Sequence, residues 1–211
     1  MNLALRFDQA LDTKFKKVDT SDLVFYGALA ICAHLTLLIV NRFLIFNVVK
    51  ASISEQMRPF YSFDFYLFTF TAILAELTFF VLGWLFVIGM ANLLDGQSNA
   101  RALFGGLALC YVPVVMSSVA TFVVYFSQAD KVNTVALAQA QTGEQLWAAI
   151  DASFSGPAFA AAIRGEKIAY GALLLLAVEA VSRICNLGRL KALVCIGLFV
   201  GVLFMINYFA G

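Results

Sequence analysis

Two carboxylates, Glu76 and Glu179, lie deep inside long apolar stretches of the sequence. Two basic residues also fall within these stretches, Arg42 near the outer end of one and Arg183 four residues after Glu179, and the single histidine, His34, lies near the middle of the stretch that holds Arg42. Ionisable groups are costly in the hydrocarbon of a membrane, so they are the first candidates for a functional role there. These side chains have the chemistry to relay a proton or an ion, or to hold helices together as charge pairs.

The spacing of these residues predicts two charge pairs. Glu179 and Arg183 are four residues apart, which places them on one face of a helix within reach of each other. Counted along their helices at about 1.5 Å per residue, Arg42 and Glu76 lie at nearly the same depth, so we expect them to meet. Structural pairing is the favoured interpretation, and a proton or ion path with His34 as relay is the alternative.

The composition indicates a protein that resides in a lipid bilayer. Hydrophobic residues make up 62% of the 211-residue chain, charged residues make up 13%, and the mean hydropathy is +0.89. A soluble domain has about 45–50% apolar and about 25% charged residues, and it could not bury this much apolar surface. The formal net charge of +1 gives no electrostatic reason to expect nucleic acid as a partner.

Five stretches are long and apolar enough to cross a membrane. They cover about residues 23–47, 65–94, 102–126, 168–186 and 190–209. Every backbone polar group needs a protein partner in lipid, which favours helices, and the alternation typical of a barrel is missing from the sequence. The predicted fold is therefore all-α, a polytopic bundle of five spans over residues 23–211 in one compact domain. Candidate N-caps are Ser21 or Asp22, Asp64, and Ser98 or Asn99.

Two segments outside these spans also carry helical patterns. In residues 1–22 apolar side chains recur at helical spacing, which predicts an amphipathic arm at the membrane interface, with a frayed tail as the alternative. In the outer loop over residues 127–167, Thr142 and Gln145 fit the capping box of one helix, and a second short helix is expected over 158–164. This loop either docks on the membrane surface or caps the bundle.

Small residues predict close helix contacts in two places. Gly105 and Gly106, followed by Pro113, should let the third span approach a neighbour and kink. Gly197 and Gly201 form a GxxxG motif in the fifth span, and such motifs permit close contact between helices. The second motif serves either packing within the chain or a dimer face, and the sequence leaves both open.

We find no sequence pattern that predicts catalysis or a bound cofactor. The sequence has no HExxH, Walker A or dinucleotide fingerprint, and no second histidine is present to share a metal with His34. The four cysteines lie in or beside apolar segments without CxxC spacing, as buried small hydrophobic residues do. We therefore expect neither an enzyme nor a cofactor or metal site.

Basic residues set the expected orientation. The turn between the fourth and fifth spans holds Arg183, Arg189 and Lys191, and positive charge in short turns marks the cytoplasmic side. We expect the N-terminus inside and the C-terminus outside. The inner membrane of a bacterium is the expected location, with an organelle membrane as the second choice.

Two motifs resemble those of a known family. A polar turn at Gly96 leads into an apolar run that reaches Tyr111-Val112-Pro113, and a short basic turn over residues 186–192 joins the last two spans. This arrangement resembles the Yip family, five-span membrane proteins whose eukaryotic members associate with Rab-type GTPases and vesicle traffic. In that family two residues commonly separate the tyrosine from the proline, whereas one does here. The resemblance covers about residues 65–210 and implies a bacterial-type member without catalytic residues.

Two functional hypotheses follow. The first is a non-enzymatic scaffold or accessory subunit that acts in the bilayer through contacts with other membrane proteins or with a second copy of itself. The second is a transporter or channel component that uses Glu76 and Glu179, with Arg42 and His34 in support.

Overall fold

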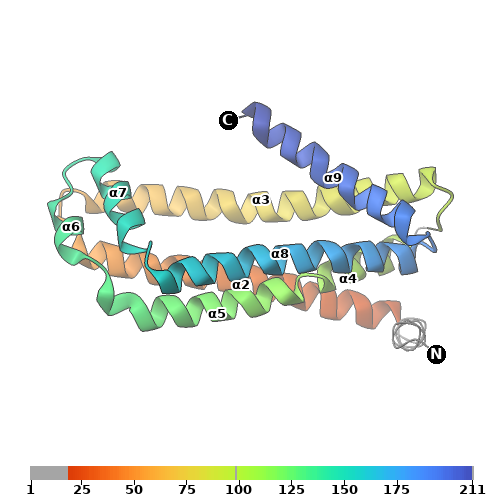
Figure 1. Cartoon of the computed structure of the whole chain (residues 1–211), viewed down its shortest axis with the longest axis horizontal. Coiled ribbons are helices and arrows are strands. Elements are labelled where there is room, and N and C mark those ends of the chain that lie inside the picture. Colours follow the sequence, from red (N-terminus) through yellow and green to blue (C-terminus); the bar gives the residue numbers. More distant parts are fainter. Residues whose placement is uncertain (1–18, 98, 211) are drawn as a thin grey trace. The chain divides into compact units, whose positions relative to one another are not determined.

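The computed structural model describes residues 19–97 and 99–210, and all regular structure in them is helical. The predicted all-α class is therefore confirmed. The elements are α2 (Thr20–Ser52), α3 (Arg58–Leu93), α4 (Ala100–Leu109), α5 (Val112–Gln128), the 3-10 turn η1 (Ala129–Lys131), α6 (Thr134–Gln139), α7 (Gly143–Ser153), α8 (Pro157–Ile184) and α9 (Arg189–Ala210). Figure 1 labels the helices. The predicted arm over residues 1–22 falls almost wholly outside the described residues.

Three stretches of helix are long and apolar enough to cross a membrane. They are α2, α3, and α4 with α5 taken together over Ala100–Gln128. Large apolar side chains on these helices face outward, for example Phe63 and Phe70 of α3, which are 66% and 65% exposed. Contiguous exposed apolar surface of this kind is suited to lipid rather than to water.

Helix α3, which covers the second predicted span, begins earlier than the sequence suggested. Asp64 was expected to cap it, but α3 begins at Arg58, so Asp64 lies inside the helix. Pro59 explains the difference, because proline in the first turn has a fixed φ suited to a helix and gives up an N–H that has no partner there. The helix has 36 residues in all.

Of the predicted N-caps of α2 and α4, the first is wrong and the second is confirmed. Asp19 precedes α2 and accepts a hydrogen bond from the Ser21 amide at 3.3 Å, so the start lies before the expected caps Ser21 and Asp22. Asn99 caps α4 as predicted, because its side chain accepts from the Ala102 amide at 3.1 Å.

The segment between α5 and α8 holds less loop than expected. The Gln145 amide donates to Thr142 Oγ1 at 3.3 Å, and Gln145 Oε1 accepts from the Gln141 amide at 2.9 Å. No separate helix covers residues 158–164, because α8 begins at Pro157 and continues without a break to Ile184. Proline again occupies the start of a helix, where it is best tolerated.

The chain divides into two compact units, whereas the short connections had suggested one. Unit 1 takes in the described residues up to Cys32, Phe79–Val112 and the chain from Gly171 onward. Unit 2 takes in Ala33–Thr78 and Pro113–Tyr170. Helices α2, α3 and α8 therefore contribute residues to both units.

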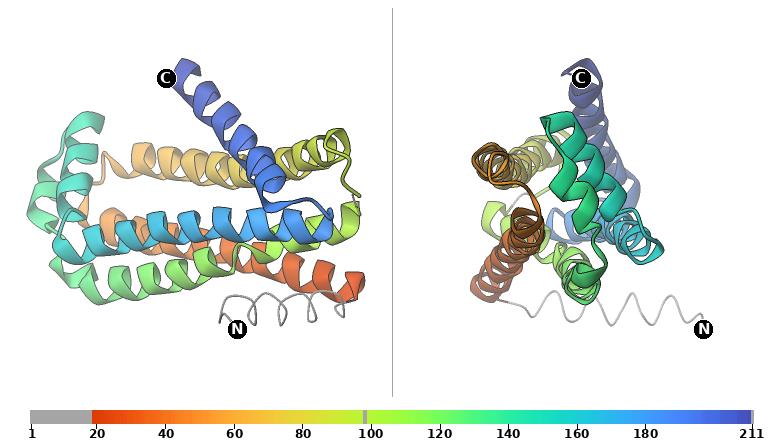
Figure 2. Two further views of the ribbon diagram at one scale, coloured as in Figure 1. Left: turned by 45° about the vertical axis from the view of Figure 1, so that its right-hand side comes forward. Right: turned by 90° about the vertical axis from the view of Figure 1, so that its left-hand side faces the viewer.

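Unit 1 packs through small and medium side chains. Its core includes Val181, Cys185 and Cys195, each fully buried. Helix α9 crosses the later part of α3 obliquely, where Phe86 and Phe199 lie 5.6 Å apart, and then diverges from it (Figures 1 and 2). Of the four cysteines expected to be buried, Cys32 alone is exposed.

Unit 2 packs through aromatic rings. Phe46 of α2 stacks on Phe65 and Tyr61 of α3, with ring centroids 4.2 and 5.4 Å apart. The short helices α6 and α7 lie beside the end of α2 and the start of α3 (Figure 1). Each contributes a fully buried leucine, Leu137 and Leu146, to this core.

Candidate functional site

Two polar contacts define how α2 and α3 are paired in unit 2. His34 Nε2 lies 3.9 Å from Glu76 Oε2, and Arg42 Nη1 donates to the carbonyl of Phe68 at 3.1 Å. A step of eight residues along α2 is thus matched by a step of eight residues back along α3. The two helices are antiparallel and hold this register over at least two turns.

This register shows that the predicted pairing of Arg42 with Glu76 is wrong. The depth count assumed that the two spans begin and end level, at Leu23 and Leu94. The observed register is displaced by about eight residues, or about 12 Å along the helices. Arg42 therefore meets a backbone carbonyl of α3, and Glu76 meets His34.

Glu76 is the centre of a cluster drawn from three helices. Tyr170 of α8 donates from its hydroxyl to Glu76 Oε1 at 3.1 Å, while His34 of α2 faces the other carboxylate oxygen. His34 is 3% exposed. A carboxylate beside a histidine and a phenol can take up and release a proton. The sequence singled out His34 and Glu76 but gave no sign of Tyr170.

Asn41, one residue before Arg42, presents a buried acceptor. Its Nδ2 donates to the carbonyl of Ser118 on α5 at 3.1 Å, and this contact fixes which end of the amide carries the oxygen. The remaining atom, Oδ1, is buried and has no hydrogen-bond partner among the described residues. A buried acceptor left in this way costs about 1–3 kcal/mol. The first predicted span ended at about residue 47, but α2 continues eleven residues beyond Asn41, to Ser52.

A second carboxylate lies close by. Thr121 of α5, 4% exposed, donates from its hydroxyl to Glu166 Oε1 of α8 at 3.1 Å. Sequence reasoning missed Glu166, because the fourth span was expected to begin at residue 168. The early start of α8 at Pro157 is what brings Glu166 into unit 2.

These polar groups face one cavity of about 770 Å³. Such a volume lies within the range of about 300–1,000 Å³ typical of small-molecule sites. Every residue that lines it belongs to unit 2. The polar and charged part of the lining consists of His34, Asn41, Arg42, Ser118, Thr121, Glu166 and Tyr170.

Aromatic and aliphatic side chains form the rest of the lining. Trp147 of α7 lies 6.3 Å from Tyr61 and 5.9 Å from Phe68, measured between ring centroids. Phe65 and Tyr125 complete this part of the wall. The segment between α5 and α8 thus supplies Trp147 to the cavity and covers it at that end.

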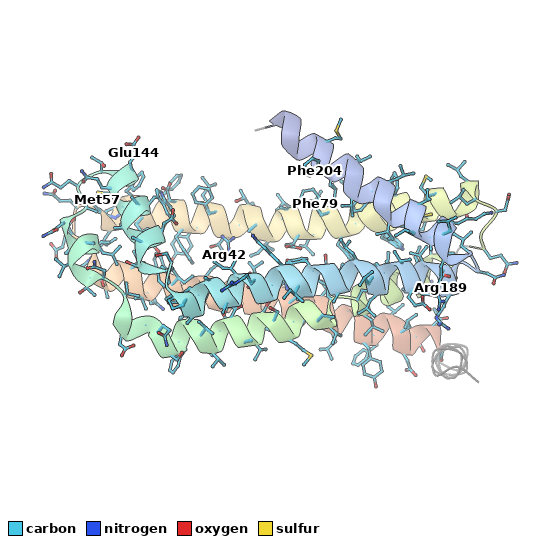
Figure 3. The ribbon with its side chains drawn as sticks, viewed as in Figure 1. Arg42, Met57, Phe79, Glu144, Arg189 and Phe204 are labelled. Carbon is cyan, nitrogen blue, oxygen red and sulfur yellow. The ribbon has the colours of Figure 1, made fainter. Side chains whose placement is uncertain are left out.

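The other predicted charge pair, Glu179 with Arg183, lies in unit 1, and a third residue, Arg189, joins it. Arg183 Nε donates to Glu179 Oε1 at 2.7 Å, as the spacing predicted. Arg189, at the start of α9, adds contacts from Nε to Oε2 at 3.0 Å and from Nη2 to Oε1 at 3.1 Å (Figure 3). Two guanidinium groups thus neutralise one carboxylate. The basic turn before α9 signalled Arg189, which had been used only to assign orientation.

The predicted packing glycines differ in their surroundings. A Cβ on Gly105 would lie 2.6 Å from the backbone of Leu23, and one on Gly27 would lie 2.5 Å from the Gly105 carbonyl. Helices α2 and α4 therefore meet backbone to backbone in unit 1, and the sequence gave no warning of Gly27. A Cβ on Gly197 or Gly201 would meet no atom within 4 Å.

Two further predicted residues lie near these contacts. A Cβ on Gly106 would press on the side chain of Ile184. The third predicted span is interrupted at Cys110 and Tyr111, between α4 and α5, and Pro113 is the second residue of α5. A proline at this position removes the hydrogen bond that would join the two helices.

Comparison with known proteins identifies no relative. No protein-family model, no curated protein and no solved structure matches the chain. The resemblance to the Yip family therefore stays a prediction. Among the described residues, no cluster of three or more His, Cys, Asp or Glu side chains is placed to hold a metal ion.

Proposed function

We propose that this chain is a multi-pass membrane protein that binds a small molecule in the cavity of unit 2 and acts as a transporter or channel component. The observation that carries the proposal is the cavity itself, lined by Arg42, Glu166 and the buried amide of Asn41. Polar and charged groups among apolar helices are expensive, and they commonly line a substrate or ion pathway. This places the second sequence hypothesis ahead of the first.

The proposal includes five spans, with α8 and α9 as the fourth and fifth. Helix α9 has 22 residues and α8 has 28, and each exceeds the length of about 20 residues that a bilayer requires. The N-terminus would lie on the cytoplasmic side of a bacterial inner membrane. Cysteine accessibility at the two ends, read from each side of sealed vesicles, tests this topology.

Trp147 offers a direct test of binding. The chain has two tryptophans, so Trp84→Phe leaves Trp147 as the single fluorophore, inside the cavity lining. We expect its emission to shift when a ligand of the right chemistry is added to the full chain in lipid nanodiscs. The probes are four small molecules that share a phenylalkyl body and carry an amine, an alcohol, a carboxylate or an amino acid group.

A pair of matched valine variants then locates the ligand. Val114 is 1% exposed and lines the cavity, whereas Val119 on the same helix is 46% exposed. Both substitutions are made in a protein that also carries Trp147→Phe, and the measured quantity is ligand flux rather than fluorescence. We expect Val114→Trp to fill the cavity and abolish this flux. Val119→Trp in the same background should leave flux intact. Undiminished flux in a folded Val114→Trp protein would place the ligand elsewhere.

A second candidate is the scaffold role, which the open face of α9 favours. Gly197 and Gly201 have no atom near the position of a Cβ, so another transmembrane helix can approach there. Cross-linking through cysteines placed at these positions would capture a second copy or a partner. If Gly197→Ile and Gly201→Ile leave the oligomeric state in nanodiscs unchanged, this role loses its support.

A further inference from the structure

We propose that the cavity of unit 2 selects an organic cation, namely a primary or secondary amine that is protonated at neutral pH and carries an apolar or aromatic body. The inference rests on the proposed function, because it names the ligand class of the same site.

Two side chains of the cavity lining, Asn41 and Glu166, have hydrogen-bond acceptor capacity left. Asn41 Oδ1 is buried without a partner, and its amide cannot be turned round without losing the contact to Ser118. Glu166 receives one hydrogen bond from Thr121, and an ionised carboxylate can accept about four. A ligand that donates hydrogen bonds satisfies these atoms, whereas a ligand that only accepts them leaves them unsatisfied.

The charges near the cavity also favour a cation. Glu166 is in the lining, and Glu76 lies directly behind it, bonded to the lining residue Tyr170. Arg42 is the single arginine or lysine among the lining residues, and its Nη1 is directed to the carbonyl of Phe68. Two carboxylates and one guanidinium, together with the imidazole of His34, therefore surround the cavity, and Glu166 is the carboxylate in the lining that a ligand cation can pair with.

The aromatic wall suits the rest of such a ligand. Tyr61, Phe68 and Trp147 lie close together at the α7 end of the cavity. Aromatic faces attract ammonium groups and also pack against apolar bodies. An amine of this kind can therefore place its head near Asn41 or Glu166 and its body against these rings.

The test compares the four phenylalkyl probes by titration of the full chain, with Trp147 as the sole tryptophan. We expect the amine to bind at least about tenfold more tightly than the alcohol and the carboxylate, which corresponds to about 1.4 kcal/mol. Tighter binding of the carboxylate or of the amino acid, or equal binding of the alcohol, would overturn the cation inference while the binding function stands. Failure of all four probes to bind would count against the binding function as well.

Two variants assign the selectivity to residues. Glu166→Gln keeps an oxygen for Thr121 but removes the charge, so amine affinity should fall by about tenfold or more while alcohol affinity holds. Asn41→Leu removes the free acceptor and should weaken the amine several-fold. The matched control is Glu144→Gln on α7, an exposed residue outside the lining, which should change nothing (Figure 3). If Glu166→Gln and Glu144→Gln behave alike, Glu166 does not select the cation.

Discussion

The two units use glutamate among apolar helices in opposite ways. In unit 1, Glu179 is held by the guanidinium groups of Arg183 and Arg189, so its charge is neutralised within the fold. In unit 2, Glu76 faces a phenol and a histidine, and Glu166 faces a threonine hydroxyl. Hydrogen bonds from hydroxyl groups orient a carboxylate without cancelling its charge. The comparison separates a carboxylate that guanidinium groups hold from carboxylates that receive hydroxyl donors.

Packing follows the same division. Unit 1 brings helix backbones into contact at Gly27 and Gly105, which leaves no room for even a methyl group. Unit 2 packs through rings such as Phe46 and Phe65 and holds the cavity. Contact between helix backbones therefore occurs in the unit where guanidinium groups pair with Glu179, and the cavity occurs in the unit where a hydroxyl holds Glu166.

The largest effect is expected at the backbone contact of unit 1. Gly105→Ala places a Cβ 2.6 Å from the carbonyl of Leu23, a rigid group, so the helices must separate. We expect a loss of about 3 kcal/mol in the free energy of unfolding, measured by denaturant titration in detergent. Gly171→Ala is the control, because a Cβ there meets nothing within 4 Å and alanine favours a helix by up to about 1 kcal/mol. Equal free energies of unfolding for the two variants would contradict the tight contact.

The next effect concerns the neutralised carboxylate. Glu179→Gln leaves Arg183, whose side chain is 10% exposed, without its anion, and should cost about 2 kcal/mol of unfolding free energy. Arg189→Gln should cost less than about 1 kcal/mol, because that side chain is 60% exposed and solvent screens it. Both losses are measured by the same denaturant titration. A larger loss for Arg189→Gln than for Glu179→Gln would show that the pairing is a surface feature.

Glu76→Gln sharpens the contrast, because little change in stability is expected. A glutamine oxygen still accepts from Tyr170, so the free energy of unfolding should fall by less than about 1 kcal/mol. Proton-coupled flux in liposomes should fall much more. A loss of stability as large as that in Glu179→Gln would erase the distinction between the units.

The smallest effect is expected at the start of α2. Hydrogen bonds from the side chain and amide of Ser21 hold the pKa of Asp19 below its ordinary value. A lowered pKa means that the contribution of Asp19 is present above the pKa of the unfolded chain and is lost as the pH falls through the lower folded value. The protection factors of amides in the first turn of α2, which correct for the pH dependence of intrinsic exchange, should therefore fall in acid. Asp19→Ala should show low protection at every pH, and Asp19→Asn, which still caps, should lose only the pH dependence of the protection.

The helical class and the approximate positions of the helices were predictable from the sequence, whereas the contacts between helices were not. Apolar stretches and the Asn99 cap are local signals, and the structure has helices where they predicted them. The partner of Arg42 depended on the register between α2 and α3, which the depth count set by levelling Leu23 with Leu94 and which no local pattern reveals. A misplaced helix start hid Glu166, since α8 extends eleven residues ahead of the predicted span. The contact of Gly27 with Gly105 depends on tertiary structure alone, so no local pattern could reveal it.

The eight-residue register between α2 and α3 limits how this protein can vary in length. Each residue added to a helix turns everything beyond it by about 100°. One insertion between His34 and Arg42 would keep the first contact with α3 and rotate the second away from Phe68, and Asn41 would turn out of the cavity with it. Substitutions within the two stretches 34–42 and 68–76 can be tolerated if size and polarity are kept. Insertions and deletions in them should be rare among related chains, because a compensating change in one helix cannot restore the angle in the other.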